Sequence, residues 1–174
     1  MKNEKKKKIT FKSVLPYIIV IVVVILLRTF IITPAMVDGD SMLPNLQNNN
    51  IVLLNKLNYK LNGLKRFEVV VVDHEGTRLI KRVIALPGEH VEYKDNNLYI
   101  DGFLIEENFK HDTTHDFKLE EIGYLKIPGD MYFVVGDNRN NSIDSRVVGL
   151  IPKEEILGKV HIRIFPITKI GRVK

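Results

Sequence analysis

Three short stretches of the 174-residue chain hold side chains that could carry out a reaction, and the first of them centres on Ser41. This serine lies between Gly39 and Pro44, in a backbone that glycine bends and proline stiffens. Such a loop holds a hydroxyl at one fixed place, as a nucleophile requires. On its own the pattern is more typical of a serine turn. The other two stretches, residues 78–84 and 136–146, favour the nucleophile.

A hydroxyl becomes a strong nucleophile only when a neighbouring base takes its proton. The five histidines are scattered, and none belongs to a compact motif; they stand at positions 74, 90, 111, 115 and 161. Lys81 and Arg82 lie in a strand-like run whose two faces are largely apolar, so at least one cation must be drawn into the interior. Desolvation lowers the pKa of a lysine, whereas arginine keeps its proton. Lys81 is therefore a candidate general base, although for this strand taken alone a lysine that reaches solvent at a sheet edge is the favoured interpretation.

The elements that must position these residues are mainly β. Apolar and β-branched runs bounded by polar turns predict strands; they cover residues 51–54, 68–72, 79–86, 90–94, 97–100, 103–105, 124–127, 131–135 and 159–165. Asp95-Asn96 and Asp101-Gly102 are typical of tight hairpins. Pro152 to Leu157 predicts one short helix. The fold class expected is an antiparallel β catalytic domain with a short helix, anchored by an N-terminal transmembrane helix.

Residues 106–123 are polar and weakly patterned, and we predict a solvated excursion from the sheet. His111 and His115 lie four residues apart within it, a spacing that aligns two ligands only on a helix. The intervening Asp-Thr-Thr disfavours a helix. The sequence therefore predicts no metal site, and no cofactor is expected.

The chain divides into three parts. Residues 1–13 are polar and basic, and residues 14–32 form a mostly apolar segment of about 19 residues, close to the length of a membrane span. The basic tail predicts a cytoplasmic N-terminus, with residues 33–174 as an extracytoplasmic catalytic domain. The alternative is a cleaved signal peptide, although Arg28 and Pro34 disfavour cleavage.

Charge and composition exclude several functional classes. The net charge is +5, and six lysines lie within the first 12 residues, so the remainder carries +5 − 6 = −1. This basicity belongs to a tail and predicts no nucleic-acid partner. The chain lacks cysteine, which excludes disulfides and a thiol nucleophile.

Taken together, the three stretches resemble the conserved boxes of the bacterial type I signal peptidases, the Ser–Lys dyad family S26. Residues 39–44 (Gly-Asp-Ser-Met-Leu-Pro) are similar to the nucleophile box and residues 81–89 to the lysine box. Residues 136–146, with Gly-Asp-Asn-Arg at the start and Asp-Ser-Arg at the end, are similar to the last box. The resemblance runs from the apolar segment to Phe165.

The resemblance implies a membrane-bound serine endopeptidase that removes signal peptides from exported preproteins at the outer face of the cytoplasmic membrane. It assigns Ser41 as the nucleophile, Lys81 as the general base and Ser142 as the residue that helps orient the lysine. Asp144 and Arg146 correspond to a structural pair beside the site, although an exposed salt bridge of little energetic value is the preferred interpretation. The backbone N–H of Ser41 would hold the oxyanion.

The partners implied are signal peptides and the phospholipid membrane. Five residues are expected near the pockets for small substrate side chains: Ala35, Val37, Met42, Leu46 and Ile80. The sequence departs from the family pattern at Asn45, at Phe67-Glu68 and at Ala85, which affects the expected turn geometry and none of the reacting groups. Two alternatives are a membrane-tethered β module that only binds a partner, and a self-cleaving repressor-type protein, which the apolar segment disfavours.

Overall fold

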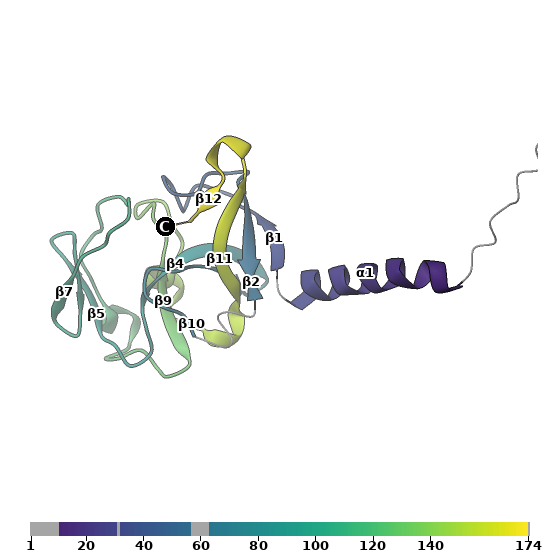
Figure 1. Cartoon of the computed structure of the whole chain (residues 1–174). Coiled ribbons are helices and arrows are strands. Elements are labelled where there is room, and N and C mark those ends of the chain that lie inside the picture. Colours follow the sequence, from purple (N-terminus) through teal and green to yellow (C-terminus); the bar gives the residue numbers. More distant parts are fainter. Residues whose placement is uncertain (1–10, 31, 57–62, 174) are drawn as a thin grey trace, which may run out of the picture.

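The larger of two antiparallel sheets carries the catalytic candidates, in the strand order β1-β2-β11-β3-β4-β9-β10, with β12 paired to β11. Its strands are β1 (Ile32–Met36), β2 (Ile51–Asn55), β3 (Val69–His74), β4 (Thr77–Ala85), β9 (Met131–Val135), β10 (Ile151–Pro152), β11 (Ile156–Phe165) and β12 (Gly171–Arg172). The computed structural model describes residues 11–30, 32–56 and 63–173. Figure 1 shows the strands of this sheet curving around one another beside a smaller lobe.

The smaller sheet has the strand order β7-β6-β5-β8. Its strands are β5 (Val91–Lys94), β6 (Asn97–Ile100), β7 (Phe103–Ile105) and β8 (Phe117–Lys118). The two tight hairpins are confirmed. Asp95 and Asn96 turn with φ of 50° and 65°, and Asp101 and Gly102 with φ of 50° and 82°. These residue types tolerate the left-handed region that two-residue hairpins need.

The helices of the β body are all short. They are η1 (Leu119–Ile122), α3 (Ser145–Val148), η2 (Lys153–Glu155) and η3 (Ile167–Lys169). The predicted helix at 152–157 shrinks to the single turn η2, because Ile156 and Leu157 enter β11. The strand predicted at 124–127 is wrong, since these residues belong to no strand: Ile127 exchanges backbone hydrogen bonds with the turn at residues 88 and 89, and the Tyr124 N–H donates to the Leu119 carbonyl at 3.4 Å.

Residues 106–123, predicted as a solvated excursion from the sheet, are mostly exposed or half-buried, but three of their side chains reach the interior. Thr114 and Leu119 are buried, and Phe117 stacks on Phe133 in the core. Glu107 accepts a hydrogen bond of 2.6 Å from the buried Arg139. Polar composition concealed this burial because the polar side chains satisfy one another inside the protein. His111 contacts Glu107 and His115 is exposed.

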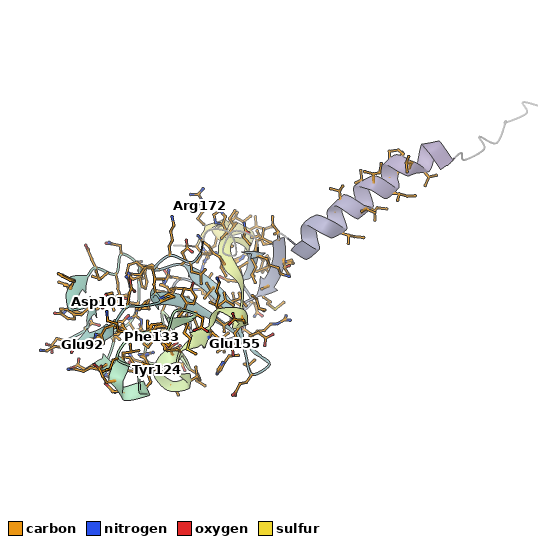
Figure 2. The ribbon with its side chains drawn as sticks, turned by 90° about the horizontal axis from the view of Figure 1, so that it is seen from below. Glu92, Asp101, Tyr124, Phe133, Glu155 and Arg172 are labelled. Carbon is orange, nitrogen blue, oxygen red and sulfur yellow. The ribbon has the colours of Figure 1, made fainter. Side chains whose placement is uncertain are left out.

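The helix α1 (Phe11–Phe30) projects away from the β body (Figures 1 and 2). It lies three residues earlier than the predicted segment 14–32 and ends before Ile32, which pairs with Asn55 in the sheet. Apolar side chains along it, from Leu15 to Ile25, are exposed. By length and apolarity, no helix in the described part of the chain qualifies as a membrane span.

Candidate active site

Ser41 lies in the loop between β1 and β2, as the sequence predicts. Gly39 adopts φ of 87°, a conformation that favours glycine, and its N–H donates to the side-chain oxygen of Asn48 at 3.2 Å. Asn138 holds the loop from the other side. Its backbone N–H donates to the Ser41 carbonyl at 3.0 Å and its side-chain amide to the Asp40 carbonyl at 3.1 Å. The nucleophile loop is therefore fixed by the third stretch of the sequence.

Lys81 reaches this serine from β4. Its Nζ lies 2.8 Å from the Ser41 Oγ, and the residue is 2% exposed. Burial lowers the pKa of Lys81 from 10.5 to about 8; Asp144 and Asp137 oppose this shift and Arg146 reinforces it. A lysine with this pKa is partly neutral near physiological pH and can accept a proton.

Arg82 is also buried, so the strand draws both of its cations into the interior. Its Nε and Nη2 donate to the two carboxylate oxygens of Asp137, each at 2.7 Å, and its guanidinium lies 4.0 Å from the centre of the Phe109 ring. A two-point ion pair of this kind satisfies a buried charge. The Arg82–Asp137 pair therefore joins β4, which carries Lys81, to Asp137, the residue directly before Asn138.

Asn45, the departure from the family pattern after Pro44, has a clear structural role. Its side-chain amide donates to Asp137 and to the Lys110 carbonyl, both at 2.7 Å. Its own carbonyl accepts from Arg163 of β11 at 2.9 Å. The nucleophile loop is thus bonded to the Arg82–Asp137 pair, to the 106–123 segment and to β11.

Asp144 and Arg146 do not form the exposed salt bridge that was the preferred interpretation. The Asp144 side chain is fully buried, and it accepts from Arg146 at 2.8 and 2.9 Å and from the Gly136 N–H at 3.0 Å. Burial alone would raise the pKa of Asp144, but Arg146 and the Gly136 N–H hold it below its usual value. The pair fixes the turn from β9 into α3, next to the lysine.

Ser142 packs against Gly136, where a side chain would clash with Ser142 and with the Ser41 carbonyl. Its buried hydroxyl forms no hydrogen bond of good geometry within the described residues, although its proximity helps to lower the pKa of Asp144. It therefore makes no bond to Lys81 in this structure, and its role in orienting the lysine stays a prediction.

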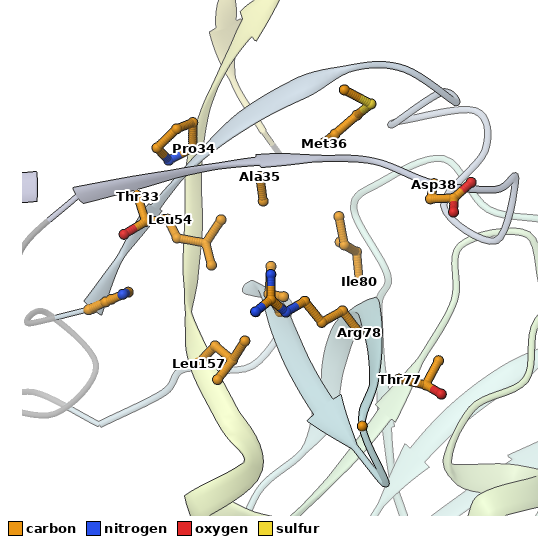
Figure 3. A pocket seen from close by; sticks show the side chains of 13 residues that line it. Thr33, Pro34, Ala35, Met36, Asp38, Leu54, Thr77, Arg78, Ile80 and Leu157 are labelled. Carbon is orange, nitrogen blue, oxygen red and sulfur yellow. The ribbon is translucent and has the colours of Figure 1, made fainter. Parts of the chain in front are cut away.

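A cavity of about 690 Å³ opens between β1, β4 and β11 (Figure 3); its lining includes Ile80, the residue before Lys81, and Asp38, three residues before Ser41. Of the five residues expected near it, Ala35 and Ile80 line it. Val37, Met42 and Leu46 instead belong to the buried core cluster against which Ala35 and Ile80 pack. The three residues are too deeply buried to contact a substrate directly, each being at most 2% exposed.

Sequence reasoning missed Asn138 and Asn45 as residues that position the nucleophile. Asn138 belongs to the recognised third stretch, yet its partners lie about 98 residues away in the chain. Within the described residues, no group of three or more histidine, aspartate or glutamate side chains comes close enough together to hold a metal ion.

An antiparallel β domain that places a serine hydroxyl against a buried lysine defines a class of serine hydrolase. The sequence profile of the family described as "Signal peptidase, peptidase S26" matches residues 10–165. The chain therefore belongs to the signal peptidase family, peptidase S26, and is a serine endopeptidase.

Individual relatives agree with this assignment. The chain is 37% identical to a signal peptidase I of Bacillus amyloliquefaciens, over the full length of both proteins. It is 35% identical to signal peptidase I S of Bacillus subtilis strain 168, covering 98% of this chain and 97% of the relative. A crystal structure of a signal peptidase I from Enterococcus faecalis V583 is similar with a TM-score of 0.51 and 38% identity, covering 55% of this chain and 95% of that one.

Proposed function

We propose that this protein removes N-terminal signal peptides from exported preproteins, with Ser41 as nucleophile and Lys81 as general base. The observation that carries the proposal is the 2.8 Å contact between the Lys81 amine and the Ser41 hydroxyl in a buried setting. Family membership supports the substrate class, since the relatives are named signal peptidases.

The reaction follows from this geometry. Neutral Lys81 takes the Ser41 proton as Oγ attacks the carbonyl carbon of the scissile peptide bond. The oxyanion accepts a hydrogen bond from the Ser41 N–H, which has no acceptor within the described residues. Protonated Lys81 then gives its proton to the leaving amine of the mature protein. Lys81 then takes a proton from water as the water oxygen attacks the acyl-enzyme carbonyl, and it returns that proton to the departing Ser41 Oγ as the signal peptide is released.

The cavity between β1, β4 and β11 is the proposed binding groove for the signal peptide. Ala35 and Ile80 give it apolar walls, and Ile80 directly precedes Lys81 in β4. Such walls accept a methyl group and disfavour bulk. Replacing the alanine just before the cleaved bond with phenylalanine should lower kcat/KM at least about 100-fold.

The proposal includes a membrane anchor formed by the N-terminal apolar segment, with the β body on the extracytoplasmic face. The exposed apolar side chains of α1 and the lysines before it support this placement. The full chain should then remain in the membrane pellet after alkaline carbonate extraction. Recovery of the full chain in the carbonate supernatant would contradict the proposed membrane anchor and would not affect the roles proposed for Ser41 and Lys81.

The experiment that tests the dyad is cleavage of a preprotein by the purified full chain in detergent. Ser41→Ala and Lys81→Arg should both abolish cleavage while the protein stays folded, because arginine keeps its proton. Replacing each histidine singly by alanine should leave most activity. An active Lys81→Arg protein would overturn the mechanism, and an intact preprotein with the wild-type chain would favour a tethered binding module.

A further inference from the structure

Two cations lie in the wall of the proposed peptide groove. Arg78 of β4 and Lys56, just after β2, both line the cavity, together with a single carboxylate, that of Asp38. Figure 3 shows the Arg78 guanidinium extending across the middle of the cavity, toward Leu157 and away from Asp38. A groove that had only to accept small apolar side chains would not need these charges.

In the part of the chain that the structure describes, neither cation has an ion-pair partner. Within the described residues Arg78 and Lys56 form no ion pair, and Asp73, which faces Arg78 across the β3–β4 ladder, forms none with it. The buried arginines of the same body, Arg82 and Arg139, each hold a carboxylate. The charge of Arg78 is therefore free to meet a ligand.

The backbone of β4 indicates how a bound peptide would come to lie beside Arg78. Strand β4 pairs with β9 only from Arg82 onward, so the described chain leaves residues 77–80 without a strand partner on that side. An extended peptide can add to such an edge. Arg78 and Ile80 lie on the same face of β4, about 7 Å apart along the strand. If one substrate side chain lies beside Ile80, a second side chain two or more residues away along the peptide would reach Arg78.

The direction of the peptide follows from the position of α1. The cavity runs under β1 from Thr33, next to the end of α1, to Asp38, three residues before Ser41 (Figures 1 and 3). In the proposed function both α1 and the signal peptide come from the membrane. The peptide segment that precedes the cleaved bond then extends from Ser41 toward Thr33, past Arg78.

We propose that Arg78, assisted by Lys56, selects signal peptides that carry a carboxylate side chain at the third to fifth residue before the cleaved bond. The inference rests on the proposed function, because it assigns a specificity to the same groove. Since Arg78 is exposed in the free protein, the preference should be modest, about three- to tenfold in kcat/KM.

The test uses the full chain in detergent and a set of preprotein-derived peptides. Each peptide has alanine just before the cleaved bond. The peptides come in pairs that differ at one position, where one member has glutamate and the other has glutamine. This position is moved in turn from the second to the sixth residue before the bond. The measured quantity is the glutamate-to-glutamine ratio of kcat/KM at each position. We expect the ratio to peak at about three to ten within the third to fifth positions and to fall toward one in high salt.

Variants assign the peak to the arginine. Arg78→Gln should reduce the ratio to about one, Arg78→Lys should retain most of it, and Arg78→Glu should make lysine-bearing peptides preferred. The matched control is Arg172→Gln, which removes an exposed arginine on β12 outside this cavity and should keep the wild-type ratio.

The outcomes separate the two proposals. Ser41-dependent cleavage with a ratio near one at every position, or a peak that survives Arg78→Gln, overturns the specificity and leaves the peptidase proposal standing. Cleavage that persists in Ser41→Ala, or no cleavage of any peptide by the wild-type chain, overturns both.

Discussion

Asp137 and Arg82 form a buried, two-point ion pair in which each of the two nitrogen–oxygen distances is 2.7 Å. Arg82 follows Lys81 directly, and Asp137 precedes Asn138, which holds the Ser41 carbonyl. The pair therefore sets the distance between the backbones that carry the proposed nucleophile and base. The Asn45 amide, at 2.7 Å from Asp137, adds the nucleophile loop to the same network.

Asp137→Asn should lower the free energy of unfolding by about 3–5 kcal/mol, because it leaves a buried guanidinium without its counter-charge. Urea unfolding followed by circular dichroism measures this. The matched control is Asp101→Asn, which breaks an exposed pair with Lys126 and should cost at most about 1 kcal/mol. Equal losses in the two variants would contradict the assigned role of the buried pair.

Activity should rise with pH through the pKa of Lys81. The amine must be neutral to take the Ser41 proton, so kcat/KM should increase about tenfold per pH unit below the midpoint and level off above it. The free enzyme's midpoint is expected at about 8. His74→Gln should leave the profile unchanged, because His74 pairs with Glu155, away from the dyad. A midpoint near 6.5 that disappears in a histidine variant would instead indicate a histidine base.

Lys81→Met should stabilise the folded protein at pH 7. The pKa of Lys81 is about 8 in the folded state against 10.5 ordinarily, so the unfolded chain binds the proton more tightly and protonation favours unfolding. This costs the wild type roughly 3 kcal/mol below pH 8, and the lost Ser41 hydrogen bond offsets about 1 of it. The variant should gain roughly 2 kcal/mol at pH 7, and the gain should turn into a loss of about 1 kcal/mol as pH rises through 10.5, where only the lost hydrogen bond counts.

Urea titrations at pH 7 and above pH 10 measure this difference. Lys159→Met is the control, because Lys159 forms an ion pair with Glu68 and should give no such gain. A Lys81→Met protein less stable than wild type at pH 7 would mean that the buried lysine is not destabilising.

Gly136→Ala should lower kcat at least about 100-fold, since its Cβ would displace Ser142 or the Ser41 carbonyl beside the reacting hydroxyl. Single-turnover cleavage of a saturating peptide measures the effect. Gly129→Ala is the matched control: its Cβ would meet no atom within 4 Å, and its activity should be close to that of the wild type. Normal turnover by Gly136→Ala would show that the glycine is not needed for close packing at the site.

The sequence predicted those parts of the fold that depend on neighbours in the chain. The hairpins at 95–96 and 101–102 were predictable because turn chemistry is local. The burial of Asp144, and of Thr114, Phe117 and Leu119 within residues 106–123, was not predictable, because it depends on partners that composition does not reveal. Asn45 contacts Asp137 across 92 residues, a pairing that no local pattern encodes. The apolar setting of Lys81 was visible in the sequence, whereas its contact with Ser41 required the folded structure.

The place of β11 in the large sheet governs when the site is assembled. The strands β2 and β3 are separated by β11, which is made more than 80 residues after β3 and whose Arg163 holds the Asn45 carbonyl. Long-range pairing of this kind forms late in folding. A nascent chain that contains Ser41 and Lys81 but not yet β11 therefore lacks the hydrogen bond from Arg163 to the loop that carries Ser41. The order of synthesis thus places the last support of the Ser41 loop near the C-terminal end of the chain.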